Sequence, residues 1–559
     1  MTPLSRAAAL LGVLLVAGSA AVCAHTASET QYLTGLGKDD GVTWEFYCTA
    51  GRNGGTWTTI VVPSCWELEG FGTYNYGHDS SPASEQGLYR RTFNVPAGWS
   101  GRRVELVFEG SMTDTAVTVN GNSAGPTHQG GFTEFRYDIS ALLNYGTSNL
   151  IEVTVAKRSA NTSINQAERE ADYWIFGGIY RPVYLIAHPA ESIRRFALNP
   201  LANGTLSGVV HFAGLAASAD LVATVRTTNG TLVGALPPVA LTANQSNATI
   251  TGNFPGIVPW SMENPSLYDL TLELTRSGNL LHSATDRIGF RTVQVIPGNG
   301  FYLNGVKIRM NGVNRHTFWP DSGRTSSAAL SAEAVALIKG TNMNAVRMSH
   351  YPPDKHFLAE CDAQGLLVIN ELPGWQSPAY DNTVAPRLVQ ELVERDVNRP
   401  SVVLWANGNE GGWNLTVDDD YALHDPQARP VIHPGSNYSG NLAQGGMDTT
   451  HYPTYSTLTS KLGGSNLYLP TEFLHGLYDG GHAAGLQDYW NAMRASSKGA
   501  ADFSGYSRTK ASCAPTAGTR STPMATTPPT ASSAPTTRKS RATRRSAKSG
   551  RRLWCLRHP

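Results

Sequence analysis

Ser401-Val-Val-Leu-Trp405-Ala-Asn-Gly-Asn409-Glu410 decides the fold of this 559-residue chain, because a short apolar run ends there abruptly in Asn-Glu. Further along, Tyr468-Leu-Pro-Thr-Glu472-Phe473 repeats the pattern of apolar residues followed by a Glu. Short apolar runs bounded by turn residues are typical of strands that are buried on both faces. Where such strands alternate with helices, a carboxylate at the C-terminal end of a strand lies where β/α barrels carry their chemistry. The sequence therefore predicts two glutamates at one end of such a barrel.

The alternation of strands and helices begins at about residue 297, with predicted helices such as 331–339 and 386–396. Alternation at this spacing favours a parallel sheet that closes as a (β/α)8 barrel, expected over residues 296–500. Seven of its eight strands can be predicted: 307–311, 345–347, 366–370, 402–405, 431–433, 447–452 and 467–472.

Two β-rich segments precede the predicted barrel. Residues 28–190 contain apolar residues at every second position, interrupted by Gly and Asn turns, as in Val104–Phe108. This pattern favours a jelly-roll sandwich. Residues 191–295 contain short strands at regular spacing, the last of them predicted at 288–295, which fits an immunoglobulin-like sandwich that acts as a spacer. The predicted fold class is thus a multidomain β plus α/β protein.

The N-terminus has the pattern of a secretory signal over residues 1–24: Arg6, an apolar stretch at 7–16, and small residues at 22–24. We therefore expect a periplasmic or extracellular protein. No other stretch approaches the length of about 20 apolar residues that a membrane span needs, so we expect none. With 44 basic against 43 acidic residues, the near-neutral charge argues against a nucleic-acid partner.

Export would permit disulfide bonds. Cys48 and Cys65 either pair or stay reduced, and the sequence leaves both readings open. Cys361 lies in a predicted barrel helix and is expected in the core.

Two carboxylates facing each other are what the cleavage of a glycosidic bond requires, because one protonates the leaving oxygen while the other attacks or activates water. The string from Asp396 to Glu410 resembles the acid/base signature of glycoside hydrolase family 2, which includes β-galactosidases, β-glucuronidases and β-mannosidases. Asn344-Ala-Val-Arg347-Met-Ser-His350-Tyr-Pro and Asn311-Gly-Val-Asn-Arg-His316 resemble further signatures of that family, in the same order.

The resemblance implies a retaining exo-β-glycosidase, nearest to β-galactosidases, in which Glu410 is the general acid/base and Glu472 the nucleophile. Retention requires the two carboxyl groups to lie about 5–5.5 Å apart. Arg347 is expected to support the site by pairing with a catalytic carboxylate. By the same resemblance the substrate-binding residues are Asn409, His316, His350, His475, Tyr452, Asp172 and Trp375.

Three of these assignments depend on particular features. His475, three residues after Glu472, resembles the β-galactosidase branch, where a His at this offset helps to hold the sugar. Asp172 belongs to a string that resembles a loop reaching from the jelly roll into the site, with a turn or cap residue as the alternative. Trp375 is a candidate platform for a sugar face, with core packing as the alternative.

Some β-galactosidases of this family bind Mg²⁺ through a Glu and a His after the third strand, but residues 370–376 lack that pair. We therefore expect no metal and no cofactor. The expected partner is a β-linked oligosaccharide or glycoside, with a homo-oligomer left open. β-Glucuronides and arabinopyranosides stay open as substrates. A rival interpretation is an inactive or purely carbohydrate-binding product.

From residue 501 the composition changes to Ser, Thr, Pro, Ala and Arg, and residues 538–552 are strongly basic. A disordered linker or wall-attachment tail is one interpretation. We favour a frameshift. When plausible codons for residues 501–512 are read one base out of frame, they give an apolar string that contains a Trp and resembles the family's eighth strand. In either case the sequence predicts a truncated barrel that lacks its eighth strand, so that the first and seventh strands have open edges. It also predicts a disordered tail at 501–559.

Overall fold

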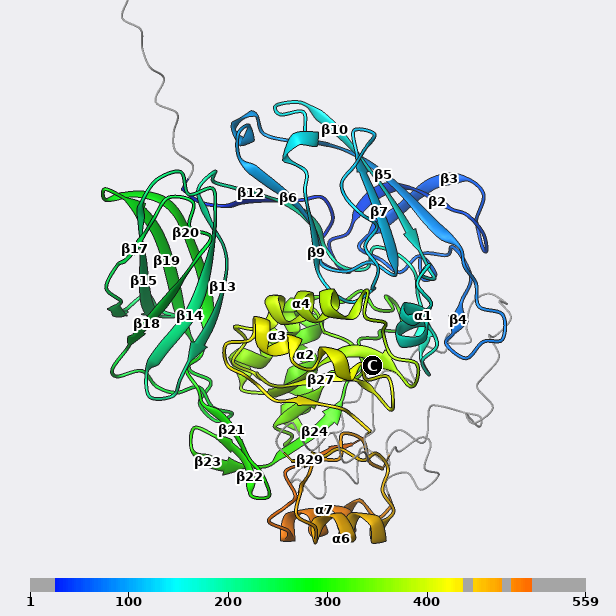
Figure 1. Ribbon diagram of the computed structural model, residues 1–559. Helices are drawn as coiled ribbons and strands as arrows, with labels where there is room; N and C mark the ends of the chain where they lie inside the picture. The colour runs from blue at the N-terminus through cyan, green and yellow to red at the C-terminus, as the bar shows by residue number, and fades with distance from the viewer. Residues whose placement is uncertain (1–25, 436–445, 475–483, 505–559) are drawn as a thin grey trace, which may run out of the picture.

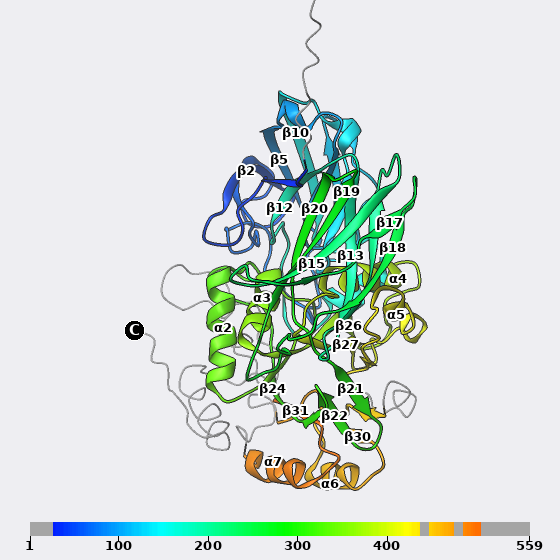
Figure 2. The same cartoon turned by 90° about the vertical axis from the view of Figure 1, so that its left-hand side faces the viewer.

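Two β-sandwiches and a β/α barrel make up the computed structural model, which describes residues 26–435, 446–474 and 484–504 (Figure 1). Figures 1 and 2 agree in placing both sandwiches on one side of the barrel and helices α6 (Tyr455–Leu462) and α7 (Leu486–Ala495) on the other. The predicted signal segment 1–24 and the tail beyond residue 504 lie outside the described residues. No helix of the described chain is long and apolar enough to cross a membrane.

The N-terminal sandwich confirms the predicted jelly roll. Its two antiparallel sheets have the strand orders β1-β12-β6-β9 and β3-β2-β5-β10-β7-β8. Alternate residues of the strands point inward, and large side chains such as Trp44, Phe46 and Phe108 fill the core between the sheets. The elements are β1 Glu29–Tyr32, β2 Val42–Cys48, β3 Trp57–Val62, β4 Asn75–Tyr76, β5 Gln86–Asn94, η1 Ala97–Trp99, β6 Arg103–Phe108, β7 Asp114–Val119, β8 Asn122–Ser123, β9 Phe135–Asp138, η2 Ser140–Leu142, β10 Ser148–Ala156, α1 Thr162–Arg169, β11 Trp174–Ile175 and β12 Val183–His188.

The second sandwich confirms the predicted immunoglobulin-like unit, with strand orders β13-β14-β18 and β16-β15-β19-β20 and with β17 paired to β15. The single strand predicted at 288–295 is wrong. The chain leaves the sandwich at Ile288 and pairs again only in a small separate sheet, β21-β22-β23, that leads into the barrel. The elements are β13 Ser192–Pro200, β14 Thr205–Ala213, β15 Ala219–Thr227, β16 Leu232–Ala235, β17 Val239–Leu241, β18 Asn247–Asn253, β19 Tyr268–Arg276, β20 Asn279–Ile288, β21 Val293–Ile296, β22 Gly300–Leu303 and β23 Val306–Ile308.

The barrel strands follow in the predicted order. The third and fourth, β26 and β27, are buried at every position, as expected for strands covered on both faces. The first strand predicted at 307–311 is displaced, because residues 306–308 pair with β22 in a hairpin and the barrel begins at Met310. The elements are β24 Met310–Asn314, α2 Ala328–Gly340, β25 Ala345–Arg347, α3 Lys355–Gln364, β26 Leu367–Trp375, α4 Ala385–Asp396, β27 Val402–Asn409, η3 Leu415–Val417, α5 Asp420–His424, β28 Val431–Ile432, β29 Met447–Asp448, α6, β30 Leu467–Tyr468, α7 and β31 Ala501–Ser504.

The prediction that the eighth strand is missing is wrong. Residues Ala501–Ser504, assigned from sequence to the tail, form β31 and pair in parallel with β24, with Gly312 opposite Phe503. Phe503 is fully buried, and a Cβ at Gly312 would lie 2.4 Å from its ring, so the glycine makes room for the aromatic side chain. Four residues that carry one large apolar side chain are sufficient for this strand.

Backbone hydrogen bonds connect the barrel strands that share no regular ladder. The N–H of Gly435 donates to the carbonyl of Thr449 (3.2 Å), which joins the fifth and sixth strands. The N–H of Ala500 donates to the carbonyl of Tyr468 (2.9 Å), which joins the seventh and eighth. The first and seventh strands are therefore paired on both sides, and the barrel is closed.

Helix α1 fixes the jelly roll against the mouth of the barrel. It begins at Asn161, whose side chain accepts hydrogen bonds from the first backbone N–H groups of the helix. Within the helix, Gln166 donates to the carbonyl of Trp375 (2.9 Å), and Glu168 accepts from the hydroxyl of Tyr380 (2.7 Å). These contacts hold α1 beside the end of the third barrel strand and the segment that follows it.

The cysteines of the described chain are buried free thiols. Of the two readings left open for Cys48 and Cys65, the structure therefore has the reduced one. Burial raises the pKa of Cys65 to about 12, so its thiol is protonated at neutral pH. Cys361 lies in α3 and belongs to the barrel core, as predicted.

Replacing Phe503 tests the eighth strand. F503A removes the buried ring that packs on Gly312, and we expect the barrel to lose about 3 kcal/mol of unfolding free energy or more. Differential scanning calorimetry measures the change. V306A, at a position that is 64% exposed, is the matched control and should change little. Equal melting temperatures for the two variants would contradict the assignment.

Candidate active site

Glu410 and Glu472 both follow barrel strands at the same end of the barrel. Glu410 comes directly after β27 with a left-handed backbone (φ 46°), and its N–H donates to the carbonyl of Pro434 (2.9 Å). Glu472 follows β30 after a short extended segment, and its carbonyl accepts from the N–H of Tyr452 (2.9 Å). The predicted convergence of the two side chains is observed.

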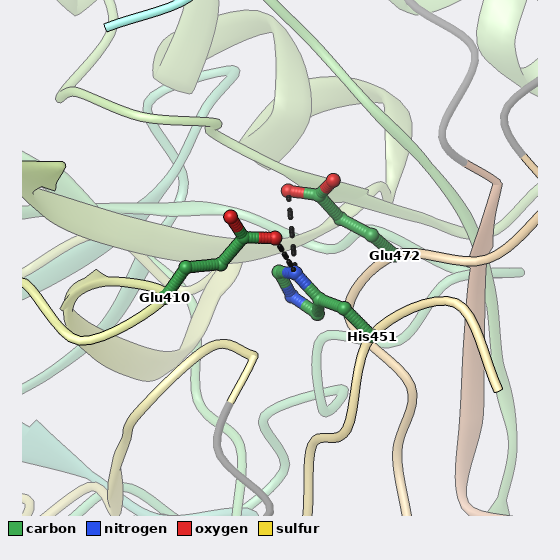
Figure 3. A group of neighbouring side chains, drawn as sticks. All are labelled: Glu410, His451 and Glu472. Atoms are coloured by element: carbon green, nitrogen blue, oxygen red, sulfur yellow. Dashed lines mark hydrogen bonds and ion pairs between the residues drawn. The ribbon is translucent and has the colours of Figure 1, made fainter. Parts of the chain in front are cut away.

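Figure 3 shows the two carboxylates facing each other with His451 beneath them. One oxygen of Glu410, one oxygen of Glu472 and a ring nitrogen of His451 all lie within 4.8 Å of one another. The two carboxylates therefore lie close together at one site, as a pair that acts on one glycosidic bond must.

Glu472 is held in its ionised form. Burial alone would raise its pKa, but the charges of His451, Arg347 and His350 and the hydrogen bond from Tyr452 hold that pKa well below the usual value. Arg347 donates to its Oε1 (2.8 Å), and the Tyr452 hydroxyl donates to its Oε2. An ionised carboxylate is what a nucleophile requires.

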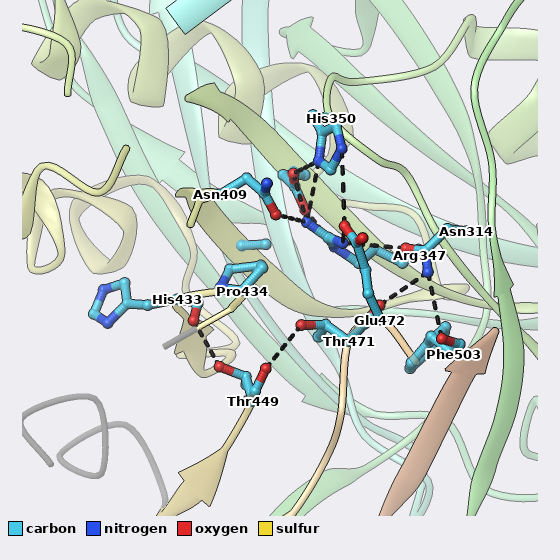
Figure 4. A network of polar contacts seen from close by, with 12 residues as sticks. Asn314, Arg347, His350, Asn409, His433, Pro434, Thr449, Thr471, Glu472 and Phe503 are labelled. Atoms are coloured by element: carbon cyan, nitrogen blue, oxygen red, sulfur yellow. Dashed lines mark hydrogen bonds and ion pairs between the residues drawn. The ribbon is translucent and has the colours of Figure 1, made fainter. Parts of the chain in front are cut away.

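Arg347 is the centre of a buried network (Figure 4). Its side chain is fully buried and makes a two-pronged contact with Glu371, at 2.6 and 2.9 Å. The same guanidinium donates to Asn314 (3.1 Å) and to Asn409 (2.8 Å). The predicted supporting role of Arg347 thus has a geometric basis, and Asn409 is fixed beside Glu410.

Sequence reasoning missed Glu371. It named this residue only as part of the segment without a Glu-x-His pair. Oε1 of Glu371 contacts both Arg347 and His350, and its Oε2 contacts Arg347. The available signal was its position in the fully buried strand β26, since a buried carboxylate on such a strand needs a cationic partner.

His350 and His316 are both buried and lie in contact with each other. Nδ1 of His350 lies 2.9 Å from Glu371, and its Nε2 lies 3.9 Å from Glu472, so this ring faces the site. His316 contacts the edge of the His350 ring at 5.4 Å between centroids, and its Nδ1 lies 3.2 Å from the Tyr351 hydroxyl.

Trp375, Tyr452 and Asp172 lie near the two carboxylates or their neighbours. Trp375 is 8% exposed and packs edge-on against His350 at 5.3 Å, so it forms a wall more than an open platform. The pKa of Tyr452 is raised by burial and by the negative charges of Glu472, Glu410 and Asp172. The charge of Asp172 thus acts at the site from the loop after α1. His475 lies outside the described residues.

His451 is the second residue that sequence reasoning missed. Its Nδ1 lies 2.8 Å from Glu410, and its Nε2 lies 2.8 Å from the hydroxyl of Thr471. Burial raises the pKa of Glu410, but the hydrogen bond and charge of His451 outweigh burial, and the net pKa lies below the usual value. The signal was its place directly before Tyr452, at the end of a predicted strand.

The fold and the paired carboxylates define a glycosidase-type barrel with two appended sandwiches. Family models match all three units: "Glycosyl hydrolases family 2, sugar binding domain" at residues 53–189, "Glycosyl hydrolases family 2" at 203–291, and "Glycosyl hydrolases family 2, TIM barrel domain" at 293–463. Together these matches cover more than half of the chain, which belongs to glycosyl hydrolase family 2.

Related sequences include two β-galactosidases. That of Arthrobacter sp. (strain B7) is 32% identical over 429 residues, which is 71% of this chain and 40% of the relative. That of Thermoanaerobacter pseudethanolicus is 31% identical over 325 residues, 57% of this chain and 44% of the relative. The chain thus spans less than half of the length of these relatives.

Solved structures share the fold. A family 2 member from Bacteroides cellulosilyticus superposes with a TM-score of 0.69 at 21% identity, covering 85% of this chain and 67% of the other. A β-glucuronidase of Bacteroides uniformis gives 0.70 at 21% identity, covering 85% and 64%. At this level of identity the likeness concerns the fold alone.

Gly435 gives a test of the packing around Glu410. A Cβ at this glycine would lie 2.8 Å from Cγ of Glu410 and 3.1 Å from Nδ1 of His451. We expect G435A to displace the carboxylate and to lower kcat at least about tenfold. Steady-state kinetics measure the loss. G305A is the matched control, because Gly305 has a similar positive φ but open space around it. Equal kcat values for the two variants would rule out the packing role.

Tyr452 gives a test of the charge of Glu472. Y452F removes a hydrogen bond that favours the ionised Glu472, so the pKa of Glu472 should rise. Because a carboxylate must be ionised to act as a nucleophile, we expect the acid limb of the pH profile of kcat/KM to move to higher pH. Y455F, at an exposed ring on α6, should leave the profile unchanged. An acid limb that stays in place in Y452F would show that this hydrogen bond does not tune the nucleophile.

Proposed function

We propose that this protein is an exported, retaining exo-β-glycosidase that acts on terminal β-galactosyl residues. The observation that carries the proposal is the facing pair Glu410 and Glu472, whose oxygens lie within 4.8 Å. Such a pair suits the double displacement of retaining glycosidases. Export rests on the pattern of residues 1–24 alone.

In the first step Glu472 attacks the anomeric carbon, and a glycosyl ester forms as the bond to the leaving oxygen breaks. The proton held at Glu410 passes to that oxygen. In the second step Glu410 takes a proton from water, the water oxygen bonds to the anomeric carbon, and the ester bond to Glu472 breaks. The two steps restore both carboxyl groups and retain the β configuration.

The surroundings of Arg347 support a neutral sugar. A glucuronide brings a carboxylate that needs a cationic partner. The guanidinium of Arg347 already contacts Glu371, Glu472, Asn314 and Asn409 and is not placed to supply one. The two β-galactosidases named above support this choice. β-Glucuronide and arabinopyranoside remain the alternative substrates.

A panel of 4-nitrophenyl β-glycosides tests the proposal. The wild-type chain should hydrolyse the galactoside in preference to the glucuronide and the arabinopyranoside. E472Q removes the nucleophile and should lower kcat by about 10³-fold or more. E45Q, at an exposed glutamate of β2, is the matched control and should retain full activity.

Two outcomes would overturn the proposal. Binding of the glycosides without hydrolysis would favour the carbohydrate-binding interpretation. Hydrolysis that survives in E472Q would show that another group is the nucleophile. Preference for the glucuronide would leave the mechanism in place and change the sugar.

A further inference from the structure

His451 lies below Glu410 and Glu472 in the view of Figure 3, with one ring nitrogen directed at their carboxylates. Its Nδ1 lies 2.8 Å from Oε1 of Glu410 and 3.9 Å from Oε1 of Glu472. Its side chain is 6% exposed, whereas that of Glu410 is 29% exposed. Glu410 is thus open to a substrate on one side and bonded to a buried imidazole on the other.

The partner of the other ring nitrogen fixes the position of the protons. Oγ1 of Thr471 lies 2.8 Å from Nε2 of His451 and 3.3 Å from the carbonyl oxygen of Thr449. A hydroxyl has one proton, and a carbonyl can only accept. Both contacts are hydrogen bonds if Thr471 donates to Thr449 and accepts from Nε2, so Nε2 carries a proton.

With Nε2 protonated, the short contact between Nδ1 and Glu410 needs one more proton. Without it, two acceptors would face each other at 2.8 Å. The proton lies either on the carboxyl group, which then donates to a neutral imidazole, or on Nδ1, which then donates to a carboxylate. The two groups therefore hold one proton jointly.

We infer that His451 is a positioning residue for the acid/base of this site: it shares with Glu410 the proton that is delivered to the leaving oxygen. The inference rests on the proposed function and deepens it. The shared proton is the one lost in the first step, when the bond between the anomeric carbon and the leaving oxygen breaks. A water proton replaces it in the second step, so the pair ends as it began.

The charged groups around the pair fit this role. Glu472, after the seventh strand, faces Nδ1. Arg347, at the end of the second strand, and His350, just after it, face Glu472 in turn. Tyr452, next to His451, donates to Glu472. When Glu472 becomes a neutral ester and the pair gives up its proton, the total charge of the site does not change.

The kinetic test separates this role from a structural one. H451N keeps an amide near the position of Nδ1 but has no group that takes up a proton, and H451F removes both hydrogen bonds. An alkyl β-galactoside needs a protonated leaving oxygen, whereas a 2,4-dinitrophenyl β-galactoside does not. We expect kcat/KM to fall about 100-fold for the alkyl glycoside and less than about threefold for the dinitrophenyl glycoside.

In the wild type, the alkaline limb of the pH profile of kcat/KM should report the loss of the proton that Glu410 and His451 share. Imidazole is more basic than a carboxylate by about two pH units. When His451 is replaced, only Glu410 holds the proton, so the alkaline limb should move to lower pH by about one unit in both variants. H211N, at a half-buried histidine of the second sandwich, is the matched control. Equal losses on both glycosides with an unmoved limb would overturn the inference.

A spectroscopic measurement tests the inference without relying on enzymatic activity. Long-range ¹H–¹⁵N spectra of the folded chain, with His451 assigned by its absence in H451N, report which ring nitrogen is protonated. We expect a protonated Nε2 in the wild type and in E410Q, with only the Nδ1 signal changed by E410Q. An unprotonated Nε2 would overturn the inference even in an inactive chain, whereas inactivity with the expected spectra would count against the proposed function alone.

Discussion

The buried guanidinium of Arg347 is the contact on which the geometry of the site depends. From the second barrel strand it reaches Asn314 on the first, Glu371 on the third and Asn409 on the fourth, and Glu472 after the seventh. A buried charge is costly unless it is paired, and removing one partner of such a pair costs about 3–5 kcal/mol. The network therefore fixes several strand ends relative to one another.

This fixed frame explains how two like charges lie close together. Burial and the charge of Glu472 disfavour ionisation of Glu410, whereas His451 favours it. Glu472 itself is surrounded by Arg347, two histidines and a tyrosine hydroxyl, which favour its ionised form. The two glutamates thus differ in their surroundings, one held as an anion and one sharing a proton. Acid/base catalysis requires such a difference, because two chemically identical side chains can take opposite roles only if their environments differ.

The sequence predicted the parts of this protein that depend on local patterns. Buried strands that end in Glu, alternating strands in the sandwiches and the two large barrel helices were visible in the order of the residues. The eighth strand was missed because it is four residues long and depends on one aromatic ring packed over Gly312, a contact that no local pattern shows. His451 and Glu371 were missed for a similar reason, since their partners lie far away in the sequence.

The central claim is that Glu410 and Glu472 perform a double displacement across one short gap in a closed barrel. Proton NMR of the reaction mixture, recorded before the product mutarotates, tests this claim most directly. The account predicts that the sugar released first has the β configuration at its anomeric carbon. Release of the α anomer would mean a single displacement by water, and the interpretation of the facing carboxylates would then be wrong.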